Sequence, residues 1–227
     1  MASEHRTAEA IRALLDGRLP DPARTWFTRT AAELDVHFEA ANFFAALAAA
    51  SRRLGRDAVE GRERSGELRF RRWTLDELGR AALLLQAVSA LPTSGGEELV
   101  SECFFRGDNR ERQAVLSALP LLPEPRRFLS IALEACRSSV QPVFEAIACE
   151  NPYPSGHFPQ PSYNQMVLKA VFTGVALGRI VGLEDRLDRE LARMAADYAQ
   201  ERRAAGRSIP AELDLLMTCA GGEREAL

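Results

Sequence analysis

The chain has 227 residues and a net charge of -3, with 46% hydrophobic and 27% charged residues. This length is enough for one domain with a sizeable core, and the small net charge excludes a general attraction for nucleic acids or anionic lipids. No apolar run approaches the ~18 residues needed to cross a bilayer, and the amino terminus lacks a signal-peptide pattern. We therefore expect a cytoplasmic protein in which residues 1–227 form a single domain.

Four cysteines, Cys103, Cys136, Cys149 and Cys219, show neither a C-x-x-C pairing nor a histidine at metal-ligand spacing. We interpret them as buried thiols in a reducing compartment. The sequence predicts no metal site and no cofactor.

Helical periodicity and end signals predict three helices in the first 55 residues. The first is capped by Thr7 and runs to about Gly17, and the second starts at Asp21 with Pro22 in its first turn. The third, residues 35–54, is so densely apolar that we expect it to be the central core helix, ended by Gly55.

Residues 56–73 break this pattern with alternating arginine and glutamate, and only Leu68–Phe70 has strand character. The arginines suggest an anion site, but the acidic residues between them nearly neutralise their charge. These acidic residues are Asp57, Glu60, Glu63 and Glu67. We therefore expect residues 56–73 to be a solvated connector, followed by a helical region over residues 74–220.

Thr74 and Glu77 form a predicted capping box, after which the chain continues as helices separated by prolines and glycines. The predicted spans are 74–91, 96–106, 109–119, 124–137, 140–150, 163–177, 188–205 and 209–219. Short connections require neighbouring helices to run antiparallel. The sequence thus predicts an all-α fold of stacked antiparallel helical hairpins, either an irregular HEAT-like array or a helical bundle.

The segment from Glu150 to Lys169 holds four of the twelve prolines, two of the three tyrosines and the only lysine. Its prolines predict a stiff, extended loop, followed by a helix that Ser162 caps. A stiff loop presents polar and aromatic side chains at a low entropy cost, which favours a ligand- or partner-binding surface. The candidate binding residues are Asn151, Tyr153, His157, Tyr163, Asn164, Gln165 and Lys169.

A structural role for the same segment stays open. Asn164 and Gln165 could instead satisfy backbone groups of the loop, since an irregular segment cannot pair its own N–H and C=O groups. His157 has no serine or cysteine motif beside it, so the sequence predicts no catalytic residue.

The acidic run from Glu184 to Asp188 resembles the aspartate-rich pattern by which all-helical prenyltransferases hold magnesium diphosphate. One alternative function is therefore a magnesium-dependent prenyl- or diphosphate-type enzyme that uses Asp185 and Asp188. No second acidic cluster accompanies the run, so we favour helix capping by both residues. Another alternative is a helical solenoid adaptor for a macromolecular partner.

Several segments of the second half carry a family resemblance. They are Asn151-Pro-Tyr-Pro154, Phe158-Pro159, Asn164-Gln-Met-Val-Leu-Lys-Ala170, Arg179-Ile-Val-Gly-Leu183, Glu190-Leu-Ala-Arg-Met194, Asp197-Tyr198, Ala204-Ala-Gly-Arg207 and Pro210. Through them the chain resembles the EboA family of metabolite traffic proteins. Trp73-Thr-Leu-Asp76 with Arg80 fits more weakly, so the resemblance covers residues 70–220, and the first 55 residues share only helical character.

The resemblance implies a protein encoded beside a prenyltransferase-like membrane protein and enzyme-like neighbours, which together move secondary-metabolite precursors toward the cell envelope. It defines no catalytic residues. It singles out Asn151, Tyr153, Asn164, Gln165 and Lys169. We therefore predict a non-enzymatic accessory or scaffold protein in metabolite export, which binds a small hydrophobic metabolite or other proteins of the same pathway.

Overall fold

The computed structural model describes residues 10–59, 64–65, 68–69 and 73–219. The chain forms two compact units, Met1–Ile147 and Ala148–Leu227. Helices make up both units, and the only strands in the described ranges are the two-residue pair β1 (Arg64–Ser65) and β2 (Leu68–Arg69). The predicted all-α class is confirmed, whereas a HEAT-like repeat and a single domain stay predictions.

In the first unit, residues 10–16 are helical. The elements that follow are α2 (Asp21–Val36), α3 (Ala40–Leu54), α4 (Leu75–Ala90), α5 (Thr93–Arg106), α6 (Asn109–Ala118), η1 (Leu119–Leu121), η2 (Pro125–Phe128), α7 (Leu129–Arg137) and α8 (Gln141–Ala148), whose last residue begins the second unit. The second unit then contains α9 (Tyr153–His157), α10 (Gln160–Phe172), η3 (Leu177–Arg179), η4 (Glu184–Arg186), α11 (Arg189–Ala204) and α12 (Ala211–Cys219).

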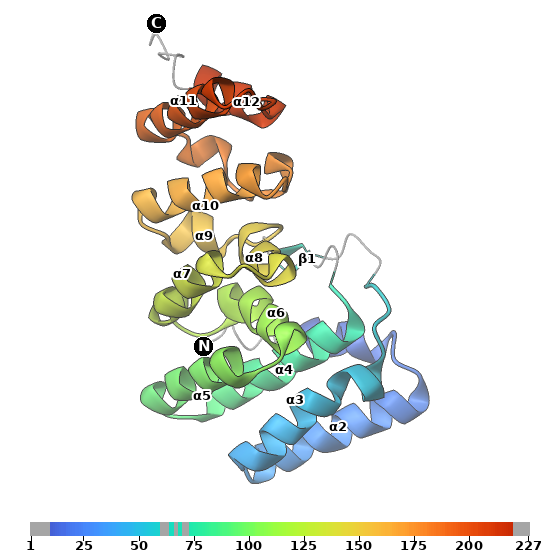
Figure 1. The fold of residues 1–227 in the computed structure, drawn as a ribbon. Helices are drawn as coiled ribbons and strands as arrows, with labels where there is room; N and C mark the ends of the chain where they lie inside the picture. The colour runs from blue at the N-terminus through green and yellow to red at the C-terminus, as the bar shows by residue number, and fades with distance from the viewer. Residues whose placement is uncertain (1–9, 60–63, 66–67, 70–72, 220–227) are drawn as a thin grey trace, which may run out of the picture. The chain divides into compact units, whose positions relative to one another are not determined.

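Helix α4 is the centre of the first unit. It contacts α2, α3, α5 and α6 (Figure 1). Its side chains are buried on nearly every face. Gly79 allows the close approach of α3, because a Cβ atom at this position would collide with the Leu54 side chain. The core of this unit is therefore built around α4.

The prediction of one central helix over residues 35–54 is wrong. His37 and Glu39 have extended backbones, so α2 ends at Val36 and α3 begins at Ala40. This break lets α3 contact both α2 and α4. The predicted end at Gly55 is confirmed, since α3 stops at Leu54.

Local capping signals set several helix starts as predicted. The Glu77 carboxylate accepts the Thr74 N–H at 2.8 Å at the start of α4. Asp108 and Glu111 form the equivalent pair at the start of α6. Each pair satisfies N–H groups that a helix leaves without intrahelical partners.

Backbone hydrogen bonds join the start of the connector, residues 56–73, to its end and to the start of α4. The Val59 N–H donates to the Trp73 carbonyl at 2.7 Å, and the Leu75 N–H donates to the Asp57 carbonyl at 3.0 Å. Glu60, Glu63, Glu67 and Phe70 lie outside the described residues, as does the Thr7 cap predicted for the first helix.

The proline-rich segment is more helical than the sequence predicts. Residues 153–157 form α9, and α10 begins at Gln160 rather than at Tyr163. Its prolines occupy helix N-caps and first turns, where the missing N–H group removes no intrahelical hydrogen bond. The expected extended loop is therefore a short helix joined directly to a longer one.

Every helix in the described ranges is too short or too polar to cross a lipid bilayer.

Candidate functional site

A cluster of buried charges joins α3, α4 and α6 within the first unit. Asp76 is fully buried and accepts hydrogen bonds from Arg80 Nη1 at 2.7 Å and from Arg110 Nε and Nη2 at 3.2 and 3.1 Å. The Ser51 and Thr74 hydroxyls donate to the same carboxylate at 2.6 and 2.5 Å. The three helices thus share one carboxylate as an acceptor.

The electrostatics of this cluster favour an ionised Asp76. Burial alone raises the pKa of Asp76, but the surrounding hydrogen bonds, led by that from Arg110, outweigh burial and hold the pKa well below its ordinary value. Arg80 also donates to the Leu47 carbonyl at 3.0 Å. An acceptor that is ionised and surrounded by donors holds helices together and is poorly suited to proton transfer.

Only part of this cluster was visible in the sequence. Asp76 and Arg80 belong to the weaker segment of the family resemblance, and their spacing of four residues just before the apolar run Ala81–Leu85 is a usable signal. Ser51 and Arg110 carry no such signal, because they reach Asp76 from other helices.

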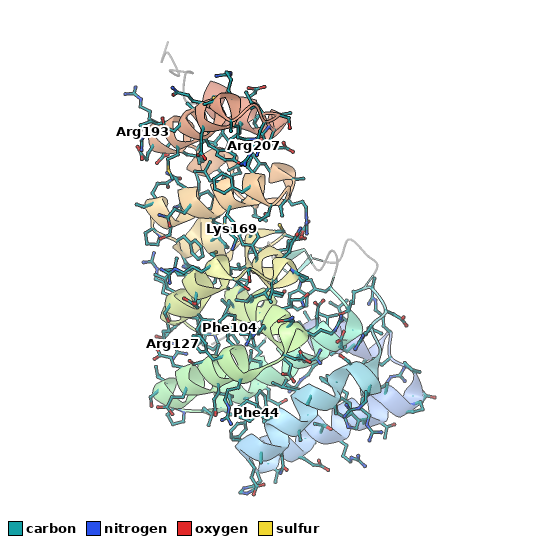
Figure 2. All side chains as sticks on the ribbon, in the orientation of Figure 1. Phe44, Phe104, Arg127, Lys169, Arg193 and Arg207 are labelled. Atoms are coloured by element: carbon teal, nitrogen blue, oxygen red, sulfur yellow. The ribbon has the colours of Figure 1, made fainter. Side chains whose placement is uncertain are left out.

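The structure places all seven predicted binding residues in the second unit, in or just before α9 and α10. Figure 2 labels one of them, Lys169, on α10. Asn151, Tyr153, Tyr163 and Asn164 are buried, His157 and Lys169 are half-buried, and Gln165 is exposed. The segment is therefore divided between internal and accessible side chains.

Asn164 joins α10 to the start of α11. Its Nδ2 donates to Asp188 Oδ1 at 3.0 Å, and its Oδ1 accepts from Gln160 Nε2 at 2.9 Å. Asp188 also accepts the Leu191 N–H at 2.7 Å, so the predicted cap at Asp188 is confirmed. Asn164 thus makes structural contacts, but with the side chains of Gln160 and Asp188 and not with the backbone groups of the loop that the sequence analysis considered.

Arg186 of η4 contacts the proline-rich segment within the second unit. Its guanidinium lies 4.5 Å from the centre of the Tyr163 ring and donates to the Ser155 and Phe158 carbonyls at 2.5 and 2.9 Å. Burial raises the pKa of Tyr163 to about 12, although Arg186 acts in the opposite direction. The tyrosine hydroxyl therefore stays protonated near neutral pH.

Asn151 and Tyr153 form a tight turn before α9. The Asn151 Oδ1 accepts the Tyr153 N–H at 2.9 Å, and the Tyr153 ring centre lies 4.7 Å from that of His157. Burial raises the pKa of Tyr153 above its ordinary value. These contacts orient the start of α9.

The accessible residues of α10 form a strip that the sequence revealed only in part. Gln165, Lys169 and Phe172 follow one another at helical spacing, and Phe172 is 53% exposed. The Phe172 ring centre lies 4.2 Å from that of Tyr198 on α11. We call Gln165, Lys169, Phe172 and Tyr198 the α10–α11 strip.

The acidic run lacks the geometry of a magnesium diphosphate site. Asp188 caps α11, and Asp185 lies within the 3-10 turn η4 rather than at a helix cap, so its predicted capping role is wrong. In the part of the chain that the structure describes, no three His, Cys, Asp or Glu residues gather to hold a metal ion.

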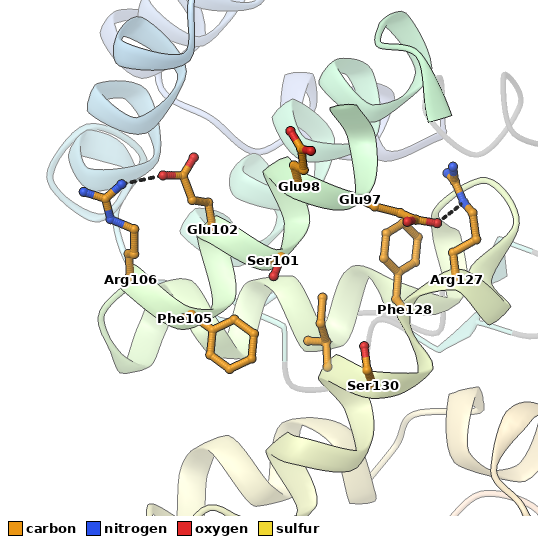
Figure 3. A pocket seen from close by; sticks show the side chains of 10 residues that line it. Glu97, Glu98, Ser101, Glu102, Phe105, Arg106, Arg127, Phe128 and Ser130 are labelled. Carbon is orange, nitrogen blue, oxygen red and sulfur yellow. Dashed lines mark hydrogen bonds and ion pairs between the residues drawn. The ribbon is translucent and has the colours of Figure 1, made fainter. Parts of the chain in front are cut away.

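A broad groove of about 600 Å³ lies between α5 and the η2–α7 segment of the first unit. Figure 3 shows Phe105 at one end and Phe128 beside Arg127 at the other. The Nε atom of Arg127 lies 3.9 Å from Glu97. The groove is wide and carries polar side chains along α5, so it does not enclose a small molecule.

A second hollow, which we call the α3–α5 pocket, has a volume of about 320 Å³. Its lining residues are Phe44, Leu47, Ala48, Glu102, Cys103, Arg106, Gly107 and Glu111. The Glu102–Arg106 ion pair borders both hollows, and Figure 3 shows it projecting from α5. Neither hollow was predicted, because each depends on how distant helices pack.

Two of the predicted buried thiols are confirmed as buried, Cys103 and Cys149, and Cys136 is half-buried. The side chain of Cys219 lies outside the described residues. Burial, followed by the nearby Glu111 and Glu102 charges, raises the pKa of the Cys103 thiol to about 12. Cys103 is therefore a neutral, apolar part of the α3–α5 pocket.

Comparison with protein families gives one match. The family model described as metabolite traffic protein EboA matches residues 7–218 of the chain. This match confirms the resemblance seen in the second half and extends it through the amino-terminal helices. Neither a curated protein nor a solved structure matches the chain significantly.

Proposed function

The chain belongs to the EboA family of metabolite traffic proteins, and from this premise we propose that it is a non-enzymatic, cytoplasmic accessory protein in the export of a secondary-metabolite precursor. The observation that carries this proposal is the family match over nearly the whole chain. The buried cluster around Asp76 supports a scaffold, because its groups are committed to one another and not to a substrate.

We assign partner contact to the α10–α11 strip. Its exposed Phe172 offers an apolar anchor, and Lys169 and Gln165 offer polar groups on the same side of α10. Aromatic anchors bordered by polar groups are typical of protein interfaces. The partner that fits the family is a protein of the same pathway, including a prenyltransferase-like membrane protein.

The enzyme alternative receives no support from a particular contact. A magnesium site at Asp188 would compete with the Leu191 N–H and Asn164 groups that this carboxylate already accepts. Metal binding there would therefore cost the start of α11 its cap.

A gene-deletion experiment tests the traffic role. Cells that make the metabolite but lack this protein should accumulate precursor in the cytoplasmic fraction and lose it from the envelope fraction, while total synthesis is unchanged. Re-expression of the wild-type chain should restore the distribution. A fall in total synthesis without any cytoplasmic accumulation would favour a biosynthetic enzyme and contradict the proposal.

Variants of the strip test where the partner binds. The double variant Lys169→Ala/Phe172→Ala should fail to restore the distribution and should lose co-purification with the prenyltransferase-like membrane protein. Its circular dichroism spectrum should match that of the wild type, although loss of the Phe172–Tyr198 contact lowers the melting temperature slightly. Gln200→Ala, an exposed position elsewhere on α11, is the matched control and should behave as wild type. Full function of the double variant would exclude the strip.

A further inference from the structure

We propose that the α3–α5 pocket binds one small molecule that has an apolar body and a hydrogen-bond-donating head, an amine or a hydroxyl. This assignment rests on the proposed function only for the origin of the ligand, which would be the transported precursor. The pocket itself follows from its lining residues, all of which belong to the first unit.

The size and walls of the pocket suit an apolar body. Its volume of about 320 Å³ falls at the lower end of the roughly 300–1,000 Å³ typical of small-molecule sites. Phe44, Leu47 and Ala48 of α3 line one side, and the neutral Cys103 thiol of α5 lines the other. Figure 2 marks the position of Phe44 on α3. A planar or branched hydrocarbon group would replace water against these walls.

The rim of the pocket selects the head group. The charged lining residues are Glu102, Arg106 and Glu111, which leave one negative charge in excess. Glu102 is paired with Arg106 one turn along α5. Ionised carboxylates can only accept hydrogen bonds, so the rim favours donors and disfavours a carboxylate ligand.

Glu111 is the acceptor best held in place. Its Oε2 accepts the Asp108 N–H at 2.8 Å in the capping box of α6, and the residue is half-buried. The helix start therefore fixes this carboxylate at the pocket edge before a ligand arrives, which lowers the entropy cost of binding.

Three probes with one body and different heads test the assignment on the purified full-length chain. We choose naphthylethylamine, naphthylethanol and naphthylacetate, with binding followed by NMR titration. The amine and the alcohol should bind with a Kd on the order of 1 mM, as expected for fragment-sized ligands, and the acetate should bind about tenfold more weakly or not at all.

Two substitutions and one control locate the binding. Ala48→Trp places a bulky ring in the pocket from an exposed position and should weaken binding by more than about tenfold. Ala41→Trp, exposed on the same helix and outside the lining, is the matched control. Glu111→Gln can keep the capping contact, so the start of α6 should be preserved. Because it removes a negative charge from the rim, it should weaken binding of the charged amine more than binding of the alcohol.

Three results would overturn the assignment: no binding by any probe, equal binding of the acetate, or unchanged binding by Ala48→Trp. All three results are measured on the purified protein. A negative binding result therefore does not decide the outcome of the deletion experiment. Conversely, probe binding that depends on Ala48 would stand even if deletion left the metabolite distribution unchanged.

Discussion

Arg80 Nη1 lies 2.7 Å from Asp76 Oδ2, one turn along α4, and both side chains are buried in the first unit. The cost of removing two charges from water often cancels their attraction, so a buried pair adds little net stability. Loss of one partner is different, because the remaining charge is then buried without compensation. The pair therefore contributes chiefly to the specificity of packing. An arrangement of α3, α4 and α6 that separated Asp76 from Arg80 would leave a buried charge unpaired and would be disfavoured.

Replacing Asp76 by Asn should lower the free energy of unfolding by about 3–5 kcal/mol, because it leaves the Arg80 guanidinium buried without its counter-charge. Urea denaturation followed by circular dichroism measures this loss. Asp197→Asn, which removes an exposed partner of Arg193, should leave stability nearly unchanged. Similar losses in the two variants would contradict the role assigned to the cluster.

The same carboxylate predicts a pH dependence. The pKa of Asp76 in the folded protein lies below its ordinary value of 3.8, so its ionisation stabilises the fold above that pH. This contribution is lost as the pH falls below about 4, where the unfolded chain takes up the proton first. The stability difference between wild type and Asp76→Asn should therefore narrow between about pH 5 and about pH 3.

Glu77 contributes to the pH dependence of stability with the opposite sign. Burial raises the pKa of Glu77, so the stability that depends on its protonation is lost as the pH rises through the folded pKa. Because both proteins retain Glu77, this effect largely cancels in the difference between them. A difference in unfolding free energy between wild type and Asp76→Asn that stays constant with pH would contradict the lowered pKa of Asp76.

Local signals explain what could be predicted of the fold. Thr74 with Glu77, and Asp188 alone, mark helix starts with side chains that bond to nearby N–H groups, so a few residues suffice to place them. The break at residues 37–39 has no such mark, because Glu39 at the start of α3 makes no side-chain capping hydrogen bond. It exists because α3 must contact both α2 and α4, which only the tertiary packing decides.

The same limit applies to the candidate sites. The sequence identified the segment from Glu150 to Lys169, but Asn164 and Gln165 received the same role although one is buried and the other exposed. Their difference depends on Asp188 and α11, which lie more than a full helix further along the chain. The α3–α5 pocket was missed for a similar reason, since α3 and α5 are separated by the connector and α4.

Asn164 and Gln165 therefore make a matched pair of substitutions. Asn164→Ala should lower the free energy of unfolding by about 1–3 kcal/mol, because it removes the buried amide that hydrogen-bonds to both Gln160 and Asp188. Gln165→Ala, at the exposed neighbouring position, should change stability by no more than about 0.5 kcal/mol. Thermal unfolding of both variants measures the contrast, and equal effects would argue against a structural role for Asn164.

Gly182 and Ser155 should be energetically coupled. Gly182 has a φ of 70°, and a Cβ atom there would collide with the Ser155 side chain. Gly182→Ala should therefore destabilise the second unit by about 1–2 kcal/mol through its left-handed backbone alone, and by more through the collision. Denaturant unfolding of the single and double variants measures both components.

Ser155→Ala removes the hydroxyl that the new methyl group would meet, so the Gly182→Ala/Ser155→Ala double variant should lose less stability than the two single variants together. Gly156→Ala is the matched control, because no neighbouring element comes within 4 Å of the position that a Cβ atom would take there, and its backbone is helical. It should be neutral or stabilising by up to about 1 kcal/mol. Strict additivity in the cycle would show that the two residues do not contact.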